Sequence, residues 1–274
     1  MALFIASLNS GSNGNCYYIG NSTEAVLVDV GISCTETEKR MRQLGLSMKT
    51  VKAIFVSHEH TDHIKGVSTL ANKYKLPVYI TKETAQGLRL IRQLSIPFTA
   101  NEPVNIGGLS IVPFTKHHDA ADPHSFIISH EGVAVGVFTD IGKACTQVTH
   151  YFSQCHAVFL EANYDEELLE KGGYPIYLKN RIRGDEGHLS NKQALQLFND
   201  HRPAFMTHLL LSHLSKDNND PQVVKELFTN AAGGVEIIVA SRYEPTAVYT
   251  IVLPEEKNGA QTLLAGTVQM NMFE

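Results

Sequence analysis

The sequence predicts a layered α/β fold, in which helices cover sheets of short, buried strands. Strand-like apolar runs recur along the whole chain, and helical patterns with recognisable ends lie between several of them. In addition, a cluster of three histidines and one aspartate directly follows one apolar run. Because ligands bind at the carboxyl ends of strands in open α/β sheets, this cluster is the first candidate for a functional site.

Ten runs have the length and apolar content of strands. They cover residues 3–8, 25–28, 51–56, 77–80, 109–114, 133–138, 157–160, 205–211, 235–239 and 247–253. We expect the early strands to follow one another mostly as hairpins and the later ones to have helices between them.

Three helix starts are marked by capping residues. T-E-T-E at residues 35–38 and S-N-K-Q at residues 190–193 have the capping-box pattern, and Gly45 marks the end of the first of these helices. Asp220 followed by Pro221 predicts an N-cap with proline in the first turn.

The composition excludes several classes of protein. With 274 residues, of which 43% are hydrophobic, the chain can bury a sizeable core, and residues 1–274 are expected to form a single domain. A net charge of -5 excludes a polycation that coats nucleic acid with its whole surface. No apolar run approaches the roughly 18 residues of a membrane span, and the N-terminus lacks the features of a signal peptide. We therefore expect a cytoplasmic protein with free thiols and no membrane partner. The sequence leaves the oligomeric state open.

V-S-H-E-H-T-D-H at residues 56–63 concentrates four metal-ligand side chains in one loop. His58 and His60 project from the same side of an extended segment and can chelate one ion. Asp62 and His63 are better placed for a neighbouring ion, because the apolar spacing over residues 64–74 predicts a helix that begins at this cluster. Imidazole and carboxylate ligands suit Zn, Fe or Mn, and the lack of thiolates argues against a closed structural zinc site. The alternative is a solvated polar loop.

The order His-x-His-x-Asp-His resembles the signature of the metallo-β-lactamase superfamily, and the resemblance covers nearly the whole chain. It implies the metallo-β-lactamase fold, an α/β four-layer αβ/βα sandwich, with a site for two divalent metal ions. Zn is the first choice, with Mn and Fe as alternatives. Such ions lower the pKa of water and neutralise charge on a scissile phosphoryl or carbonyl oxygen, so the implied chemistry is hydrolysis.

The resemblance also implies roles for residues elsewhere in the chain. Asp29 in V-L-V-D-V-G would support the metal loop, and Asp140 in V-F-T-D-I-G would bridge the two ions. His213 in L-L-L-S-H-L-S matches the last histidine of the pattern, with His208 as its competitor.

The third histidine of the pattern falls in T-K-H-H-D-A-A-D-P-H. His118 is the first choice and His117 the alternative, whereas His124 is expected to be polar lining. The first ion would then be held by His58, His60, His118 and Asp140, and the second by Asp62, His63, Asp140 and His213.

Residues outside the metal site bear on the substrate. L-E-A-N-Y-D at residues 160–165 and G-H-L-S-N at residues 187–191 resemble elements of transfer-RNA 3′-end-processing nucleases and cyclic phosphodiesterases. By this resemblance His188 would donate a proton to the leaving oxygen, with Glu161 bound to its other nitrogen, and Asp62 would complete the catalytic set. The sequence departs from those elements at Asn163 and Leu189. The alternative is that Glu161 caps a turn and that His188 is a surface residue.

A cationic and aromatic stretch lies between these elements, in an otherwise acidic chain. Its composition suits phosphate clamping and base stacking, although a solvated basic loop is the alternative. The candidate substrate-binding residues are Lys179, Arg181, Arg183, Ser190 and Asn191. Gly11–Gly14 would either present N–H groups to a phosphate or form a tight turn.

Four elements resemble the YycJ/WalJ-like branch of the superfamily, which is associated with 5′-exonuclease activity on DNA. They are S-G-S-N-G-N-C, H-D-A, Y-P-I-Y-L-K-N-R-I and G-H-L-S-N. The predicted function is therefore a dinuclear-metal phosphodiesterase, a nuclease whose partner is DNA or another phosphodiester. A small-molecule hydrolase of glyoxalase or lactonase type is the alternative enzyme, and a metal-stabilised binding module without turnover is the alternative outside catalysis.

Overall fold

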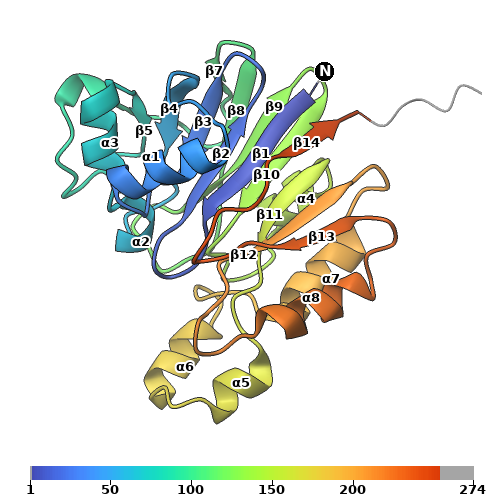
Figure 1. Cartoon of the computed structure of the whole chain (residues 1–274). Helices are drawn as coiled ribbons and strands as arrows, with labels where there is room; N and C mark the ends of the chain where they lie inside the picture. The colour runs from blue at the N-terminus through green and yellow to red at the C-terminus, as the bar shows by residue number, and fades with distance from the viewer. Residues whose placement is uncertain (1, 254–274) are drawn as a thin grey trace, which may run out of the picture.

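Two seven-stranded sheets form the centre of the computed structural model, which describes residues 2–253 (Figure 1). The strand order is β14-β1-β2-β3-β4-β5-β6 in the first sheet and β13-β12-β11-β10-β9-β8-β7 in the second. In chain order the strands are β1 (Ala2–Asn9), β2 (Cys16–Gly20), β3 (Ala25–Val28), β4 (Val51–Phe55), β5 (Val78–Tyr79), β6 (Ser95–Ile96), β7 (Val104–Ile106), β8 (Leu109–Thr115), β9 (His124–His130), β10 (Val133–Phe138), β11 (Ala157–Glu161), β12 (His208–Ser212), β13 (Glu236–Val239) and β14 (Tyr249–Val252).

The described residues form eight α-helices, five of which cover the outer faces of the sheets. They are α1 (Cys34–Gln43), α2 (Thr61–Ile64), α3 (Val67–Tyr74), α4 (Thr146–Phe152), α5 (Glu166–Lys171), α6 (Ile176–Ile182), α7 (Asn191–His201) and α8 (Pro221–Thr229), with a 3₁₀ turn at Arg92–Leu94. α1 and α3 pack on the first sheet, and α4, α7 and α8 pack on the second.

Three apolar interfaces hold these layers together. Phe55 and Phe126 meet between the two sheets, Met41 packs under α1, and Phe198 and Phe228 pack under α7 and α8. Helix, sheet, sheet and helix layers follow in that order, so the predicted αβ/βα four-layer sandwich is confirmed. The single domain predicted for residues 1–274 stays a prediction, since residue 1 and residues 254–274 lie outside the described residues.

All ten predicted strands overlap strands of the structure, and the expectation of early hairpins and later strands with helices between them is right only in part. Each sheet combines antiparallel pairs with parallel ones: β1, β2 and β3 are antiparallel before the parallel β3–β4 pair, and β7 to β10 are antiparallel before the parallel β10–β11 pair. Hairpins therefore occur in both halves of the chain. Because a parallel neighbour needs a crossover, the helices lie within the parallel part of each half.

Two of the three predicted helix starts are confirmed. Ser190 and Gln193 make both reciprocal bonds of a capping box, and Asp220 caps α8 with proline in its first turn. The capping box at residues 35–38 is wrong, because Ser33 caps α1 by accepting a hydrogen bond from Glu36 N at 3.2 Å. The helix predicted from the histidine cluster onward is broken into α2 and α3, since Gly66 N donates to Val30 O at 2.8 Å.

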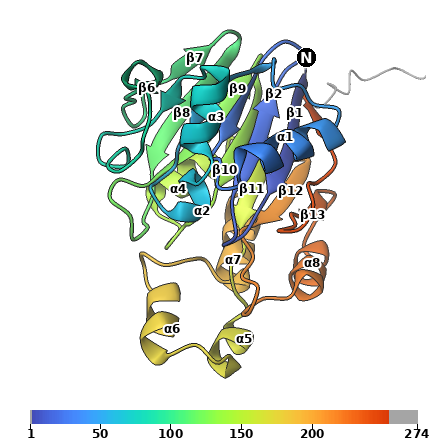
Figure 2. The same ribbon diagram turned by 60° about the vertical axis from the view of Figure 1, so that its left-hand side comes forward.

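α5 and α6 lie beyond the body formed by the two sheets, on the connection between β11 and α7 (Figure 2). Within residues 2–253, none of the helices is long and apolar enough to cross a membrane. The segment Gly11–Gly14 forms a turn, in which Gly14 N donates to Gly11 O at 2.9 Å and Gly11 N donates to Asn15 Oδ1 at 3.0 Å. Two of its N–H groups are therefore already used, which favours the tight-turn alternative.

Candidate metal centre

The predicted metal ligands come from the ends of strands in both sheets. His58, His60, Asp62 and His63 follow β4, His118 follows β8, Asp140 follows β10, and His213 follows β12. These strand ends lie at one edge of the sandwich, so residues that are far apart in the sequence meet there. We call these seven side chains the metal centre.

Three residues at this edge have left-handed backbones. Asp29, Asp140 and His213 have φ angles of 60°, 54° and 55°. A positive φ is uncommon for residues other than glycine and persists only where the surroundings fix it, often at functional sites. The backbone therefore turns sharply just after β3, β10 and β12 and points three polar side chains toward the same place.

The structure brings all seven predicted ligands together. In four groups of the described residues, one ligand atom from each member lies within 4.8 Å of the others: the groups are His58, His60 and His118; Asp62, His63 and His213; His58, His63 and Asp140; and Asp140, Glu161, His188 and His213. The Asp140 carboxylate lies between the first two groups, with 3.0 Å from its Oδ2 to His63 Nε2 and 3.7 Å from its Oδ1 to His118 Nε2. Three members of the first implied set thus meet in one group and three members of the second in another, with Asp140 near both, and the division into two ligand sets stays a prediction. Metal binding itself stays a prediction.

Hydrogen bonds behind the histidines fix their orientation. His63 Nδ1 lies 2.7 Å from Asp29 Oδ2, and the other oxygen of that buried carboxylate accepts from Ser57 N at 2.8 Å. His118 Nδ1 lies 3.0 Å from Gly187 O, to which it can donate. In both rings Nε2 is then the nitrogen that faces the centre, as expected when a partner behind a histidine sets its tautomer.

Several buried polar atoms at the centre lack partners among the described residues. His58 Nε2 has none, and neither does Asp140 Oδ2, to which His63 Nε2 is near but not aligned for a hydrogen bond. His60 Nδ1 and His118 Nε2 face each other at 3.3 Å, so at most one of them can donate. Buried polar atoms are normally satisfied. Divalent cations at this place would satisfy all four, and imidazole with carboxylate is a donor set that such ions accept. The residues present therefore fit divalent metal ions.

Burial and charge shift the pKa values of the ligands in opposite directions. Burial lowers the pKa of His118 to about 4, which keeps this imidazole neutral and able to bind a cation. Burial also disfavours the charged form of His63, but the carboxylates of Asp140, Asp29 and Asp62 outweigh it and raise the pKa of His63 to about 10. Without metal, His63 thus carries a positive charge that partly balances these carboxylates.

The alternative histidines lie elsewhere. His117 is exposed and points into a hollow described below, and His208 lies 3.3 Å from the Glu236 carboxylate at the start of its strand. His124 packs against Phe98, and its Nδ1 is 3.0 Å from Asp122 O. None of the three belongs to a group of potential ligands among the described residues. The structure therefore favours His118 and His213.

Glu161 and His188 lie beside the metal centre and contact each other. Glu161 is fully buried, and its Oε1 is 2.7 Å from His188 Nδ1 and 3.0 Å from His213 Nδ1. Burial opposes ionisation of Glu161, yet the neighbouring histidines, His188 first, lower its pKa to about 2. His188 is partly exposed. The contact implied by the resemblance is present, and the proton-donor role stays a prediction.

Supporting residues that the sequence did not reveal include three asparagine and serine side chains. Asn15 Nδ2 is 3.2 Å from Asp62 Oδ2, and Asn163 Nδ2 donates to His213 O at 2.9 Å. Ser57 Oγ donates to Asp29 Oδ2 at 2.8 Å. These residue types occur in many turns, so nothing in their sequence context distinguishes them. Asn163, which replaces threonine of the related elements, thus holds the loop of the last histidine.

Three predicted substrate contacts do not fit the structure. Lys179 is buried, and its ammonium donates to Glu170 O, which ties α6 to α5. Ser190 is the N-cap of α7, and Asn191 is buried and paired with Asn219. Because their polar groups are committed within the fold, these side chains are not available to a substrate.

Arg181 and Arg183 are exposed, as predicted, but each has a carboxylate partner. Arg181 pairs with Asp119, and Arg183 lies 3.3 Å from Glu170. Exposed ion pairs are weak and can exchange for a phosphate. A hollow of about 560 Å³ beside the metal centre is lined by His117, Asp119, Lys143, Asn180, Arg181, Gly184, Asp185, Glu186 and Gly187. Both cationic and acidic side chains line this hollow, so it is not a purely cationic surface for phosphates.

Comparisons with known proteins find related sequences and a related fold. The family model described as "Beta-lactamase superfamily domain" matches residues 24–213. The chain is 34% identical to exodeoxyribonuclease YycJ of Bacillus anthracis over 230 residues, which is 82% of this chain and 87% of the relative. It is 31% identical to exodeoxyribonuclease WalJ of Streptococcus pneumoniae over 227 residues, 80% and 83% of the two chains. Among solved structures, the metallo-β-lactamase fold protein YhfI of Bacillus subtilis has a TM-score of 0.69 at 15% identity, covering 91% of this chain and all of its own.

Proposed function

The chain belongs to the metallo-β-lactamase superfamily, and on that premise we propose that it is a metal-dependent phosphodiesterase that acts as a nuclease on DNA ends. The observation that supports this proposal most strongly is the metal centre itself, with seven ligand-type side chains and unpaired buried nitrogen and oxygen atoms. The substrate class is supported by two relatives that are named exodeoxyribonucleases and that match four fifths of the chain.

We assign two divalent ions to the centre. His58, His60, His118 and Asp140 would hold one, and Asp62, His63, Asp140 and His213 would hold the other. Zn is the first choice, with Mn and Fe as alternatives, since nitrogen and oxygen ligands suit all three. When bound, such ions activate water for attack and neutralise charge on the scissile phosphoryl group.

The protein's own side chains would complete the reaction. When the His188 ring carries a proton on both nitrogens, Nδ1 donates to the Glu161 carboxylate and Nε2 can give its proton to the leaving oxygen of the phosphodiester, which leaves a neutral imidazole. Arg181 and Lys143 line the hollow next to His118, where they can exchange their carboxylate partners for phosphates of the strand. We also propose that cleavage begins at the 5′ end of the strand, as in a 5′-exonuclease.

A thioesterase or lactonase of glyoxalase type is the second candidate, because the superfamily supports several hydrolytic reactions on one fold. It would need the metal centre but not His188, since a thiolate leaving group is stable without a proton. The Glu161–His188 contact thus favours a phosphodiester, whose alkoxide leaving group needs a proton, over a thioester; a lactone also releases an alkoxide, so this contact does not separate it from a phosphodiester.

The proposal is tested by assaying metal-reconstituted protein on 5′-labelled duplex DNA, bis-p-nitrophenyl phosphate and a thioester. We expect metal-dependent cleavage of both phosphodiesters, abolished in Asp140→Asn. In His188→Asn, the DNA rate should fall about 100-fold. Asp200→Asn and His150→Ala, at exposed positions, are the matched controls. Thioester turnover without phosphodiester cleavage would contradict the proposal and support the second candidate.

A further inference from the structure

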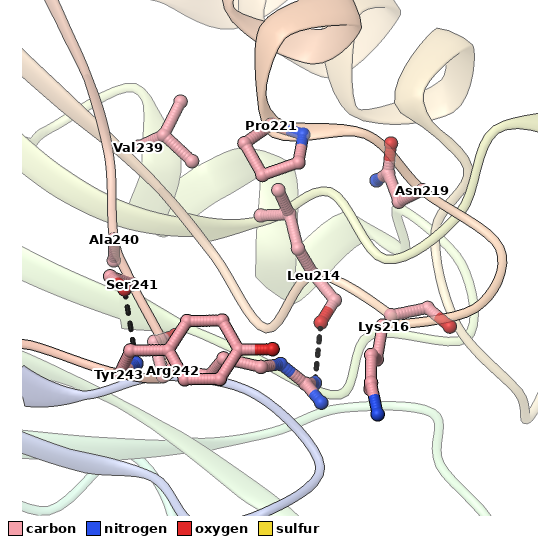
Figure 3. A pocket seen from close by; sticks show the side chains of 11 residues that line it. Leu214, Lys216, Asn219, Pro221, Val239, Ala240, Ser241, Arg242 and Tyr243 are labelled. Atoms are coloured by element: carbon pink, nitrogen blue, oxygen red, sulfur yellow. Dashed lines mark hydrogen bonds between the residues drawn. The ribbon is translucent and has the colours of Figure 1, made fainter.

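A second cavity, of about 240 Å³, lies against the loop that carries His213 (Figure 3). Ser10, which lines this cavity, accepts a hydrogen bond from His213 N at 2.7 Å through its hydroxyl. Leu214, the next residue along the chain, forms part of its wall. The cavity and the metal centre therefore share one loop, although no metal ligand lines the cavity.

The cavity has an apolar side and a cationic side. Figure 3 shows Leu214, Pro221 and Val239 along one side and the Tyr243 ring with Arg242 along the other. Tyr243 is 69% exposed, so its ring stands at the mouth, where it can cover a flat ligand. A planar, apolar group between aliphatic and aromatic side chains is the arrangement in which nucleobases are commonly held.

The charges at this cavity differ from those elsewhere near the site. Arg242 and Lys216 line it, no carboxylate does, and neither cation has an ion-pair partner among residues 2–253. Arg181 and Arg183, by contrast, are both paired. Arg242 uses only Nη2, which donates to Leu214 O at 3.1 Å and Ser12 Oγ at 3.2 Å, while Nε and Nη1 donate to no described residue. Its guanidinium thus keeps donors for a phosphate.

The guanidinium is also held in place. Gly11 has a φ of 135°, and a Cβ there would lie 2.8 Å from Arg242 Nη2, so the backbone approaches the guanidinium closely only because this residue is glycine. The same loop reaches the metal centre through Asn15, whose Nδ2 is 3.2 Å from Asp62 Oδ2. The loop that contains Gly11 and Asn15 therefore contacts both the Arg242 guanidinium at the cavity and the predicted ligand Asp62.

We propose that this cavity binds the terminal nucleotide of the DNA strand, with its base between Leu214 and Tyr243 and its phosphate at Arg242 and Lys216. The proposal rests on the proposed nuclease function and specifies how a strand end would be recognised. An enzyme that acts on ends needs a site that accepts one nucleotide and no continuing chain. A simple anion would use the two cations but leave the apolar side without a contact.

The test measures binding of dAMP, deoxyadenosine and inorganic phosphate to the full-length protein by calorimetry, in the presence of a chelator so that metal ions cannot hold the phosphate. We expect dAMP to bind more tightly than either of the other two. Arg242→Gln and Lys216→Gln should each weaken dAMP binding about tenfold, whereas Lys225→Gln, an exposed position on α8 outside the cavity, should not. Thermal melting of each variant identifies a folding defect, and the exposed Lys216 keeps the test valid if Arg242→Gln fails to fold.

Failure of this proposal can be distinguished from failure of the proposed function. If the wild-type protein cleaves DNA but dAMP does not bind, or binds equally to all three variants, the nucleotide site is wrong and the nuclease stands. If phosphate binds as tightly as dAMP, the cavity is an anion site and the nucleotide proposal is overturned. If dAMP binds as expected but metal-loaded protein cleaves no phosphodiester, the site stands and the nuclease is wrong.

Discussion

His188 Nδ1 lies 2.7 Å from Glu161 Oε1, while the other oxygen of the same carboxylate accepts hydrogen bonds from Ile141 N at 2.7 Å and Leu189 N at 3.2 Å. One buried glutamate at the end of β11 thus joins the loop of Asp140 to the loop of His188. The histidine is held in one orientation relative to the metal centre, which a proton donor requires.

Replacement of Glu161 should disturb the orientation of His188 more than it disturbs metal binding. Glu161→Gln keeps the size of the side chain but removes the charge that holds His188, so we expect kcat for DNA to fall about 100-fold and the pH–rate profile to shift. Because Glu161 Oε1 also lies 3.0 Å from Nδ1 of the predicted ligand His213, the variant is loaded with excess metal, and its metal content by elemental analysis should then remain within a factor of two. Glu226→Gln, on the exposed face of α8, is the control. An unchanged pH profile would mean that the glutamate acts only in folding.

Asp29 should set the metal affinity without touching a metal ion. Asp29→Asn removes the acceptor charge behind His63 but suits the left-handed backbone at this position, where φ is 60°. Loss of such a supporting partner typically lowers metal affinity about 10- to 100-fold. Competition with a chromophoric chelator measures this change. A metal affinity equal to that of the wild-type protein would show that Asp29 does not support metal binding.

Gly31 should tolerate no side chain. A Cβ at this position would lie 1.6 Å from Asp62 O and 2.6 Å from Asn15 N, and both are backbone atoms that cannot rotate away. Gly31→Ala should therefore displace α2 with its ligands, lowering the free energy of unfolding by roughly 1–3 kcal/mol and reducing metal binding. Denaturant unfolding gives the first quantity. Gly173→Ala, where a Cβ would meet nothing within 4 Å, should be neutral; equal effects of the two changes would refute the packing argument.

Metal binding should release protons near neutral pH. The carboxylates around His63 outweigh its burial and raise its pKa from 6.5 to about 10, and a metal ligand must be neutral, so an arriving ion displaces this proton. The raised pKa also means that the stabilisation from protonated His63 is complete below pH 6.5 and is lost as the pH rises to about 10. The metal-free protein should therefore melt at a lower temperature at pH 9.5 than at pH 6.5. Calorimetry of Zn binding at pH 7 in two buffers of different ionisation enthalpy counts the protons, and equal heats would contradict the prediction.

The metal ligands could be predicted because few residue types can hold a cation and because their strands are short, buried and easily recognised. Asp140 lies two residues after the end of β10, and His213 directly follows β12. Supporting contacts could not be predicted, since Asn15 and Ser57 act through hydrogen bonds to residues brought near only by the fold. Lys179 was wrongly predicted to bind substrate. It lies in a basic stretch of the sequence, which gave no sign that its ammonium is buried and donates to Glu170 O.

Parts of the fold were missed for similar reasons. β9 begins and ends with histidine, and β2 is a five-residue run after a glycine-rich turn, so neither had a strong strand signal. Their pairing with β8, β10 and β1 compensates for that weakness. The cavity beside His213 combines segments around residues 10, 214 and 242, a juxtaposition that no local pattern indicates.

The most direct test of the account compares linear duplex DNA with a covalently closed circle of the same sequence, each incubated with Zn- or Mn-loaded protein and with chelator-treated protein. We predict that the linear DNA is degraded to mononucleotides only in the presence of metal, and that the circle stays intact. Cleavage of the circle at the same rate would contradict action at ends. Degradation of linear DNA by chelator-treated protein or by Asp140→Asn would contradict the metal centre as the site of the reaction.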